Sequence, residues 1–409
     1  MSALLIRNIR LPDGGATEIL IEAGRITGMG PPVAAPADAT VIDGDGALVL
    51  PGLIEGHTHL DKTTWGGPWY RNEVGPTRMD RIQNERAWRI SSGHDPAARS
   101  LALAQAFLAN GTTRLRTHAD IDPDIALRHV HATMQTRDAV APFMQMQIVA
   151  FPQSGILCQP GMADWMDAAL ADGADVVGGI DPCAIDCDPV RHLDTVFALA
   201  TRHGKPIDIH LHEPGEMGTF SLGLILERTA ALGMQGKVVV SHAFCLGTLA
   251  DRDRDALLAR MAVLDVRIAT TAPAYSPVPS LQICRAAGVT VFGGNDGIRD
   301  SWTPYARPDM LDRAMHIGLR NALRRDDELA WAFECVTSAA ATGCGFADYG
   351  ISPGCRADLV AVHAETIAEA VVTAPRRALV VAAGQTVARN GVPVETDHQA
   401  LRTTTGMRE

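Results

Sequence analysis

Short apolar runs that alternate with longer amphipathic stretches fill the middle of this chain and strongly limit the folds open to it. The runs lie at residues 53–59, 112–118, 147–151, 176–179, 207–210, 238–242, 266–270 and 289–293, with helical patterns between them such as 97–109, 193–202, 222–232 and 249–261. Strands that alternate with helices predict a parallel sheet built of βα units. Eight such units are the number found in a (β/α)8 barrel, which we therefore expect here.

The segments on either side of this region have a different pattern of apolar and polar residues. Residues 16–30 and 39–52 alternate apolar and polar side chains and contain glycines, and residues 356–365 and 378–391 repeat that pattern. Alternation of this kind predicts short β-strands. Neither flank is long enough for a convincing domain of its own. We therefore expect one small β-sandwich domain built from residues 1–50 and 349–409, and a barrel at residues 51–348.

The charge of the chain argues against one broad class of partner. Its 409 residues carry a formal net charge of −11, which offers no electrostatic footprint for nucleic acid or an anionic membrane. No run approaches the ~18 apolar residues of a membrane span, and the first residues do not resemble a signal peptide. Eight scattered cysteines indicate reduced thiols. We expect a cytoplasmic protein with a small-molecule substrate, and a homo-oligomer because such assemblies are common.

Five residues that can bind a metal ion fall at the ends of predicted strands. These residues are His57, His59, His210, His242 and Asp296. The carboxyl ends of barrel strands meet at one face, where catalytic residues gather. Residues two apart in a strand point the same way, so His57 and His59 can hold one ion together. Imidazole and carboxylate ligands suit Zn²⁺ or Fe²⁺, with Mn²⁺ also acceptable, and such an ion provides hydroxide at neutral pH.

Each of these signals is weak when taken alone. A His-x-His pair, or one histidine at a strand end, is often a hydrogen-bonded structural residue. Asp296 stands beside glycines, as a turn residue would. The joint placement is the stronger signal, because every candidate ends the strand that would bring it to the same face. We therefore predict a catalytic metal site there.

Several of these segments also resemble one known family. They run from LPGLIEGHTHLDKTT at residues 50–64, through LRTHADI, MQIVAFPQSGIL, PIDIHLHE and VVVSHA, to FGGNDGIRDSW at residues 292–302. In these motifs the chain resembles the amidohydrolase superfamily, and most closely its cytosine deaminase branch. The match spans nearly the whole predicted barrel, and a split β-domain is also typical of that superfamily.

The resemblance implies a role for each matched residue. By it, the metal ligands are His57, His59, His210 and Asp296, while His242 acts on the water beside the metal, with direct ligation as a second option. It makes Glu213 the proton shuttle to the substrate ring, Gln153 the partner of the ring carbonyl and amide, and Phe151 and Trp302 pocket aromatics. Binuclear members carry a carbamylated lysine after the fourth strand. Here that segment reads VVGGIDP, so one divalent metal ion is expected.

The chemistry of the residue types agrees with these roles. Deamination of a ring carbon needs a nucleophile, a base for its proton and an acid for the ring nitrogen. Asp296 or His242 can accept the proton, and Glu213 can serve as the acid. Gln153 offers both a donor and an acceptor, which suits an amide edge.

Three polar residues near these motifs keep open roles. His118 ends the second predicted strand, either as a buried structural histidine or as a neighbour of the site. His212 shares that ambiguity. Lys62 is interpreted as a structural residue or as a cation in the pocket.

Two residues depart from the cytosine deaminase pattern. Gly297 stands where that branch has a second acidic residue, and Asn295 where it usually has histidine. We expect both at the pocket floor, where the lost carboxylate would enlarge the pocket and remove a negative charge. The main functional prediction is therefore a deaminase of cytosine or of a related, 5-substituted pyrimidine or similar heterocycle. The alternatives are hydrolysis of another cyclic or N-alkyl C–N bond, such as amine removal from a triazine, and an inactive barrel that acts as a binding protein.

Overall fold

Eight parallel strands form one of the two large sheets of this computed structural model, which describes residues 3–12 and 14–394. In sheet order they are β5 (Leu53–Thr58), β6 (Thr112–Asp120), β7 (Gln145–Phe151), β8 (Val176–Ile180), β9 (Ile207–His210), β10 (Val238–Ser241), β11 (Arg267–Thr270) and β12 (Val291–Gly293). Neighbouring strands pair in parallel, and a parallel bridge between Thr58 and Asp296 joins β5 to the segment after β12. The predicted (β/α)8 barrel is thereby confirmed.

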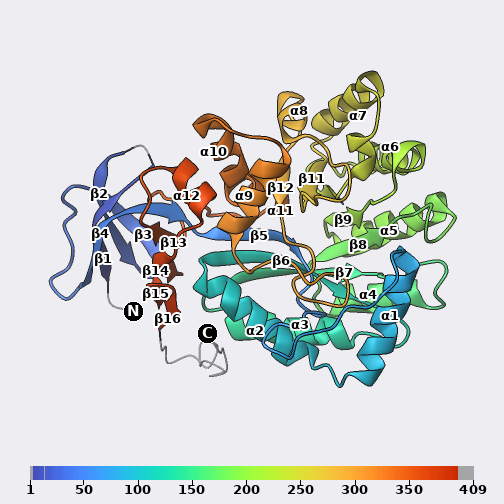
Figure 1. Ribbon diagram of the computed structural model, residues 1–409, viewed down its shortest axis with the longest axis horizontal. Helices are drawn as coiled ribbons and strands as arrows, with labels where there is room; N and C mark the ends of the chain where they lie inside the picture. The colour runs from blue at the N-terminus through green and yellow to red at the C-terminus, as the bar shows by residue number, and fades with distance from the viewer. Residues whose placement is uncertain (1–2, 13, 395–409) are drawn as a thin grey trace.

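Helices lie between the strands and cover the outside of the barrel (Figure 1). They are α1 (Arg78–Ser91), α2 (Pro96–Ala109), α3 (Arg128–Val140), α4 (Met162–Asp172), α5 (Pro189–His203), α6 (Gly215–Ala231), α7 (Asp251–Val263), α8 (Leu281–Ala286), α9 (Met310–Arg320), α10 (Asp326–Glu334) and α11 (Ser338–Cys344). The four helices expected from sequence overlap α2, α5, α6 and α7. In α2, Pro96 occupies the first turn, and the Asp95 side chain accepts hydrogen bonds from the N–H groups of Ala97 and Ala98. The start of this helix is thus encoded locally.

The two flanks of the chain together form the second sheet. Its order is β16 (Val392–Pro393), β15 (Gln385–Arg389), β14 (Arg377–Ala382), β13 (Leu359–Val362), β4 (Thr40–Pro51), β1 (Leu4–Arg10), β2 (Ala16–Glu22) and β3 (Arg25–Gly30), with α12 (Ile367–Thr373) between β13 and β14. β4 pairs in parallel with β1 and antiparallel with β13, so blue and red strands lie side by side in Figure 1. The expected β-domain from both ends is confirmed as one continuous sheet. Its boundaries at residues 50 and 349 stay a prediction, and residues 395–409 lie outside the described residues.

A single residue, Gly52, separates the two sheets along the chain. It follows β4 and precedes β5, and its backbone N–H donates to the carbonyl of Asp358 at 2.8 Å. Apolar side chains such as Ile6, Ile19 and Leu359 fill a core against the sheet of the small β-domain (the small sheet), distinct from the core of the barrel. The strand that carries the first two histidines is therefore anchored in the small sheet at its start.

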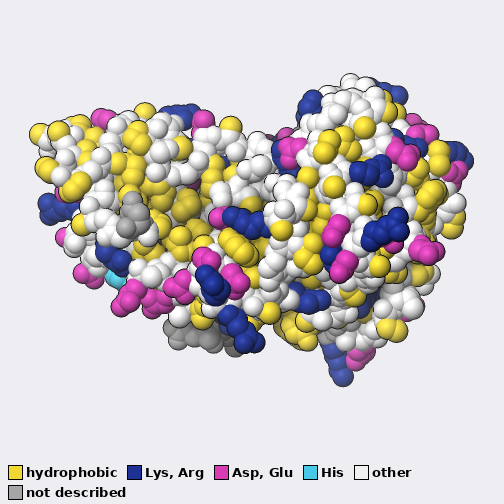
Figure 2. Space-filling model, turned by 90° about the horizontal axis from the view of Figure 1, so that it is seen from above, with side chains coloured by type: hydrophobic (Ala, Val, Ile, Leu, Met, Phe, Trp, Pro, Cys, Tyr) yellow, Lys and Arg dark blue, Asp and Glu magenta, His cyan; other side chains and the backbone are white. Residues whose placement is uncertain are grey.

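The surface and the cysteines agree with the composition. Within the two described ranges, none of the helices combines the length and apolarity that a membrane crossing requires. Acidic and basic side chains are interspersed over the face seen in Figure 2. All eight cysteines are free thiols, as expected.

Candidate metal centre and active site

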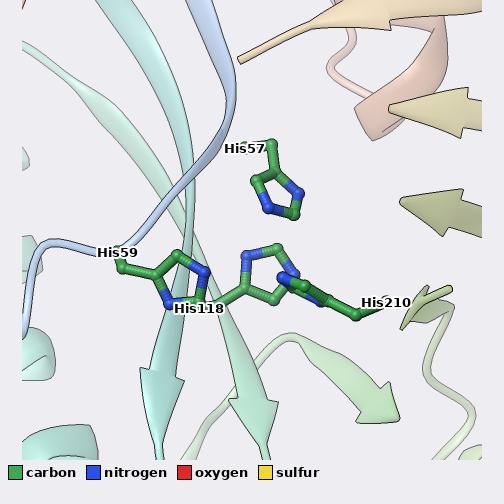
Figure 3. Close-up of side chains that lie close together, drawn as sticks. All are labelled: His57, His59, His118 and His210. Carbon is green, nitrogen blue, oxygen red and sulfur yellow. The ribbon is translucent and has the colours of Figure 1, made fainter. Parts of the chain in front are cut away.

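Four histidines gather where the barrel strands end. His57 is the second-last residue of β5 and His59 directly follows that strand, while His118 lies near the end of β6 and His210 at the end of β9. The ring centroids of His57, His118 and His210 are 4.4 to 4.6 Å apart. One ring nitrogen from each of the four lies within 4.8 Å of the others, and Figure 3 shows the rings turned toward one another. The barrel mouth therefore carries a preformed cluster of nitrogen donors.

Asp296 and His242 complete this cluster on its other side. Asp296 Oδ1 lies 3.2 Å from His59 Nε2 and 3.8 Å from His57 Nε2, and Asp296 Oδ2 lies 4.0 Å from His242 Nε2. His57, His242 and Asp296 form a second group whose donor atoms are within 4.8 Å. The structure thus brings together all five residues that the strand-end pattern selects.

The backbone bends sharply at the two residues that follow β10 and β12. His242 and Asp296 have φ values of +72° and +64°, a left-handed conformation that side chains other than glycine rarely adopt. Asp296 is held there because its N–H donates to His57 O and its carbonyl accepts from Thr58 Oγ1, both at 2.8 Å. A Cβ atom at Gly294 would meet the His57 backbone at 2.5 Å, so only glycine permits this approach. Such local strain is typical of functional sites.

Three histidines of the cluster, His59, His118 and His210, are held in their neutral form. Burial, together with the charge of Lys62, lowers the pKa of His59 to about 4, and burial lowers that of His118 to about 3. Burial likewise holds the pKa of His210 well below its ordinary value. Burial alone would raise the pKa of Asp296, but its contacts with His57 and His59 outweigh it and hold this pKa low. Neutral imidazoles beside a carboxylate are the protonation states that a metal ion requires.

Several ring nitrogens of the cluster are buried without a hydrogen-bond partner among residues 3–12 and 14–394. They are His57 Nε2, His59 Nδ1, and both ring nitrogens of His118, His210 and His242. Buried polar atoms are normally hydrogen-bonded, so unpaired imidazole nitrogens gathered in one place need an explanation. A divalent cation would bind the unprotonated nitrogen of several of these rings, and the residues present therefore fit such an ion.

Ser241 sets the orientation of one of these rings. Its hydroxyl donates to Asp208 Oδ1 at 2.6 Å and lies 3.0 Å from His57 Nδ1. Because the single hydroxyl proton goes to the carboxylate, the hydroxyl oxygen must accept from His57 Nδ1–H. The lone pair of His57 is then on Nε2, which faces the cluster.

His118 belongs to this cluster, although sequence reasoning left its role open. Its ring lies 5.1 Å from that of His59 and 4.5 Å from that of His210, between centroids. The signal that could have found it is its place near the end of the second strand, which delivers it to the same face.

A pocket opens beside the cluster of histidines and Asp296. Its wall includes all three residues predicted to contact substrate, Phe151, Gln153 and Trp302. The Phe151 ring lies 4.3 Å from that of His210, and Trp302 Nε1 donates to Glu85 Oε2 at 2.7 Å. Phe151 is therefore packed against a metal donor and Trp302 is fixed elsewhere in the pocket wall, and their role in binding stays a proposal.

Lys62 is both a cation of the pocket wall and part of a buried ionic network. Its Nζ lies 2.7 Å from Gln153 Oε1, 3.3 Å from Asp120 and 3.8 Å from Glu85. Burial disfavours its charge, but Asp120 and Glu85 outweigh burial and raise the pKa of Lys62 above its ordinary value. Since an ammonium can only donate, the Gln153 atom facing it is the carbonyl oxygen, which leaves the Gln153 amide N–H groups for other partners.

Glu213 and His212 lie in different surroundings. The Glu213 carboxylate accepts from the backbone N–H groups of Cys183 and Ala184 at 2.7 and 2.8 Å and from the Ser221 hydroxyl. His212 lies in the pocket wall, where its ring stacks on that of His242 with 4.3 Å between centroids. Its Nδ1 lies 2.9 Å from Asp181 Oδ2. His212, rather than Glu213, therefore lines the pocket.

The expectation of an enlarged pocket around Asn295 and Gly297 is wrong. Asn295 turns away from the pocket, donates to Glu55 through its backbone and side chain, and accepts from Arg313 at 2.7 and 2.9 Å. Gly297 does line the pocket, but a Cβ atom there would meet Asp300 Oδ2 at 2.0 Å. The Asp300 carboxyl fills the space that glycine leaves, and burial raises its pKa to about 7. The sequence pattern did not point to Asp300.

Two sequence relatives align with much of the chain. N-isopropylammelide isopropyl amidohydrolase from Pseudomonas sp. is 27% identical over 407 residues, covering 96% of this chain and 98% of its own length. The uncharacterized protein YahJ of Escherichia coli is 34% identical over 282 residues, which span 68% of this chain and 61% of that protein.

Two solved structures share the fold over nearly their whole length. N-isopropylammelide isopropylaminohydrolase from Burkholderia multivorans has a TM-score of 0.94 and 61% identity, over 96% of this chain and 100% of its own. A 5-methylcytosine deaminase from Klebsiella pneumoniae, liganded with 5-fluorocytosine, has a TM-score of 0.83 and 26% identity, over 97% and 98% of the two chains. The sequence profile of the amidohydrolase family matches residues 40–388. With the barrel, the histidine cluster and these matches together, the chain belongs to the amidohydrolase family.

Proposed function

We propose that this chain removes an alkylamine from an N-alkylated amino-dihydroxytriazine by hydrolysis of the exocyclic C–N bond. The observation that carries the proposal is the 61% identity with N-isopropylammelide isopropylaminohydrolase over 96% of the chain. The identity with 5-methylcytosine deaminase is 26%. These figures favour the triazine alternative of the sequence analysis over deamination of a pyrimidine.

The reaction consumes one water molecule. The water oxygen bonds to the ring carbon, the bond from that carbon to the exocyclic nitrogen breaks, and the nitrogen leaves with its alkyl group after it gains a proton. From N-isopropylammelide the products are cyanuric acid and isopropylamine. The chain must therefore take a proton from water and deliver one to the leaving nitrogen.

His57, His59, His210 and Asp296 would hold one divalent ion, with His118 beside them. Zn²⁺, Fe²⁺ and Mn²⁺ are all compatible with histidine and carboxylate donors. When bound, the ion would lower the pKa of water to ~7.

His242 and Asp296 are suited to accept the proton that the water loses. Burial, together with the nearby His212, holds the pKa of His242 well below its ordinary value, so the ring is a neutral acceptor. Asp296 Oδ2 lies 4.0 Å from His242 Nε2, so the two groups border the same small space.

Lys62 and Gln153 are suited to orient the ring. The Gln153 amide N–H groups face away from their lysine partner and can donate to a ring carbonyl. Lys62 remains charged and in the pocket wall, where it favours a ring oxygen on which negative charge builds. Asp120 holds Lys62 and Lys62 in turn holds Gln153, so little reorganisation is needed when substrate binds.

His212 is suited to protonate the leaving nitrogen. Its Nδ1–H donates to the buried Asp181 carboxylate, which orients the ring and leaves Nε2 for proton exchange. The role predicted for Glu213 remains open to test, but its carboxylate already accepts three hydrogen bonds. We assign Glu213 to holding the loop at Cys183 and Ala184 in place.

A substrate panel tests this proposal. The zinc-loaded protein is given N-isopropylammelide, ammelide, cytosine and 5-methylcytosine, and the released isopropylamine or ammonia is measured by mass spectrometry. We expect kcat/KM for N-isopropylammelide to exceed that for the pyrimidines by at least ~100-fold, the scale of specificity that a few pocket contacts supply. A pyrimidine as the best substrate would restore the deaminase prediction. No turnover of any compound would favour the binding-protein alternative.

Two variants separate the roles of His212 and Glu213. His212→Asn is expected to lower kcat by roughly 100-fold or more, the usual contribution of a general acid. Glu213→Gln is expected to lower it less, because its amide oxygen can still accept from the loop. If Glu213→Gln loses as much as His212→Asn, the assignment is reversed.

A further inference from the structure

Asp300 lines the pocket, and one of its carboxyl oxygens has no hydrogen-bond partner among the described residues. Its side chain is only 2% exposed, yet the residue lines the pocket beside Lys62 and Trp302. Oδ1 accepts from the backbone N–H groups of Trp302 and Thr303, both at 2.8 Å. Oδ2 is buried and has no hydrogen-bond partner among the described residues. An unpaired carboxyl oxygen in such a place is costly unless a ligand completes it.

The backbone is shaped to place this oxygen. Oδ2 lies 2.0 Å from where a Cβ atom of residue 297 would stand, so Gly297 is the residue that admits the carboxyl to the wall. The two backbone donors fix the other oxygen and prevent the carboxyl from rotating. The position of Oδ2 is therefore set before any ligand arrives, which lowers the entropy cost of recognition.

Asp300 and Gln153 offer complementary hydrogen-bonding groups to the same pocket. Gln153 presents amide donors, because Lys62 already occupies its carbonyl oxygen. Asp300 Oδ2 presents an acceptor. A ring amide, with a carbonyl next to an N–H, needs this combination of one donor and one acceptor from the protein.

We propose that Asp300 is a specificity-determining residue, whose Oδ2 accepts a hydrogen bond from a ring N–H of a six-membered cyclic amide or imide. This inference rests on the proposed function for the identity of the ring, since a dihydroxytriazine in its keto form carries such N–H groups. It adds a residue that selects the N–H edge of the ring, whereas an ion held by the histidines and Asp296 would act on the carbon that loses its amine.

Asp300→Asn gives a sharp test because the two backbone N–H groups dictate how the amide sits. The amide oxygen must accept from Trp302 and Thr303, so the NH₂ group takes the place of Oδ2 and opposes the ring N–H with another donor. Asp358→Asn is the matched control. Asp358 is also 2% exposed and also accepts a backbone N–H through Oδ1, but its Oδ2 lies 3.5 Å from Arg114 Nη1 and the residue lies next to β13 in the small sheet, outside the pocket.

Two measurements on the zinc-loaded full chain are needed. In steady-state turnover of N-isopropylammelide, we expect Asp300→Asn to raise KM at least ~10-fold with kcat changed less than ~3-fold, and Asp358→Asn to leave both near wild type. In calorimetric binding of cyanuric acid, which needs no turnover, we expect Asp300→Asn to weaken binding at least ~10-fold and Asp358→Asn to leave it unchanged.

The outcomes separate this inference from the proposed function. If wild type turns over the triazine but the Asp300 and Asp358 variants behave alike in both measurements, the inference fails and the function stands. If wild type binds cyanuric acid in an Asp300-dependent way without turnover, the function fails and the inference stands. If wild type neither binds nor turns over these rings, both are overturned.

Discussion

Removing the Ser241 hydroxyl should weaken metal binding without touching a metal donor. Ser241 is fully buried, and its hydroxyl joins His57 Nδ1 at 3.0 Å to Asp208 Oδ1 at 2.6 Å. Ser241→Ala leaves the His57 Nδ1–H buried without its acceptor, which costs ~1–3 kcal/mol. The ring can then change its tautomer or turn, and either change removes the Nε2 lone pair from the cluster.

The size of the effect follows from this geometry. Loss of an outer partner of a metal-bound histidine typically lowers metal affinity by ~10–100-fold, which is ~1.4–2.7 kcal/mol. We expect a loss of this order in the zinc affinity of Ser241→Ala, measured at pH 7 by competition with a chromogenic chelator. Turnover at saturating zinc should fall as well, because the tautomer decides whether the His57 lone pair faces the ion.

Ser100→Ala provides the control. Ser100 is also fully buried and its hydroxyl pairs with Thr136, but it lies in α2. It should lose stability comparable to Ser241→Ala, yet bind zinc within about 3-fold of wild type, given that distant sites act independently. Unchanged zinc affinity in Ser241→Ala, or an equal loss in Ser100→Ala, would refute the role given to this hydroxyl.

Three further predictions concern the metal, the buried Lys62 and an ion pair outside the pocket, between Asp186 and His192. Chelation of the metal should lower Tm, and added zinc should restore it, because an ion at ~1,000 times its Kd contributes ~4 kcal/mol; an unchanged Tm would count against a bound ion. Lys62→Met should lower the free energy of unfolding in urea by ~3–5 kcal/mol, since Asp120 and Gln153 lose a buried cation, and a loss below ~1 kcal/mol would contradict this. Burial would raise the pKa of Asp186, but its contact with His192 outweighs burial and lowers it. Its stabilising effect is thus present above pH ~4 and lost as the pH falls below that value, so Asp186→Asn should flatten the loss of Tm between pH 5 and 3.

The barrel and the cluster of metal-binding side chains were predictable because both depend on patterns within short segments of the sequence. Parallel strands buried on both sides read as short apolar runs, and the runs at 53–59 and 207–210 end within one residue of β5 and β9. Residues at strand ends inherit their position from the strand. Once the strands were placed, His57, His59 and His210 had to meet at one face.

The substrate half of the site depends on contacts that no local pattern encodes. The direction of the Glu213 side chain is set by the backbone of Cys183 and Ala184, some thirty residues earlier in the chain. Asn295 turns away from the pocket because Glu55 and Arg313 hold it from two other elements. Contacts between residues far apart in the chain thus set these side-chain directions. They outweigh the position in the pocket that the sequence next to Asp296 suggests.

The strand order of the small sheet has a consequence for how this protein is made. β4 needs a partner on each side, and β1 precedes it while β13 follows the entire barrel in the chain. During translation one edge of β4 therefore stays open until the barrel strands have left the ribosome. An open strand edge is a template for pairing with the wrong chain, so slow or interrupted synthesis should favour aggregation over simple loss of activity. Because β4 continues through Gly52 into β5, the scaffold under His57 and His59 is translated before the other seven barrel strands and completed only after them.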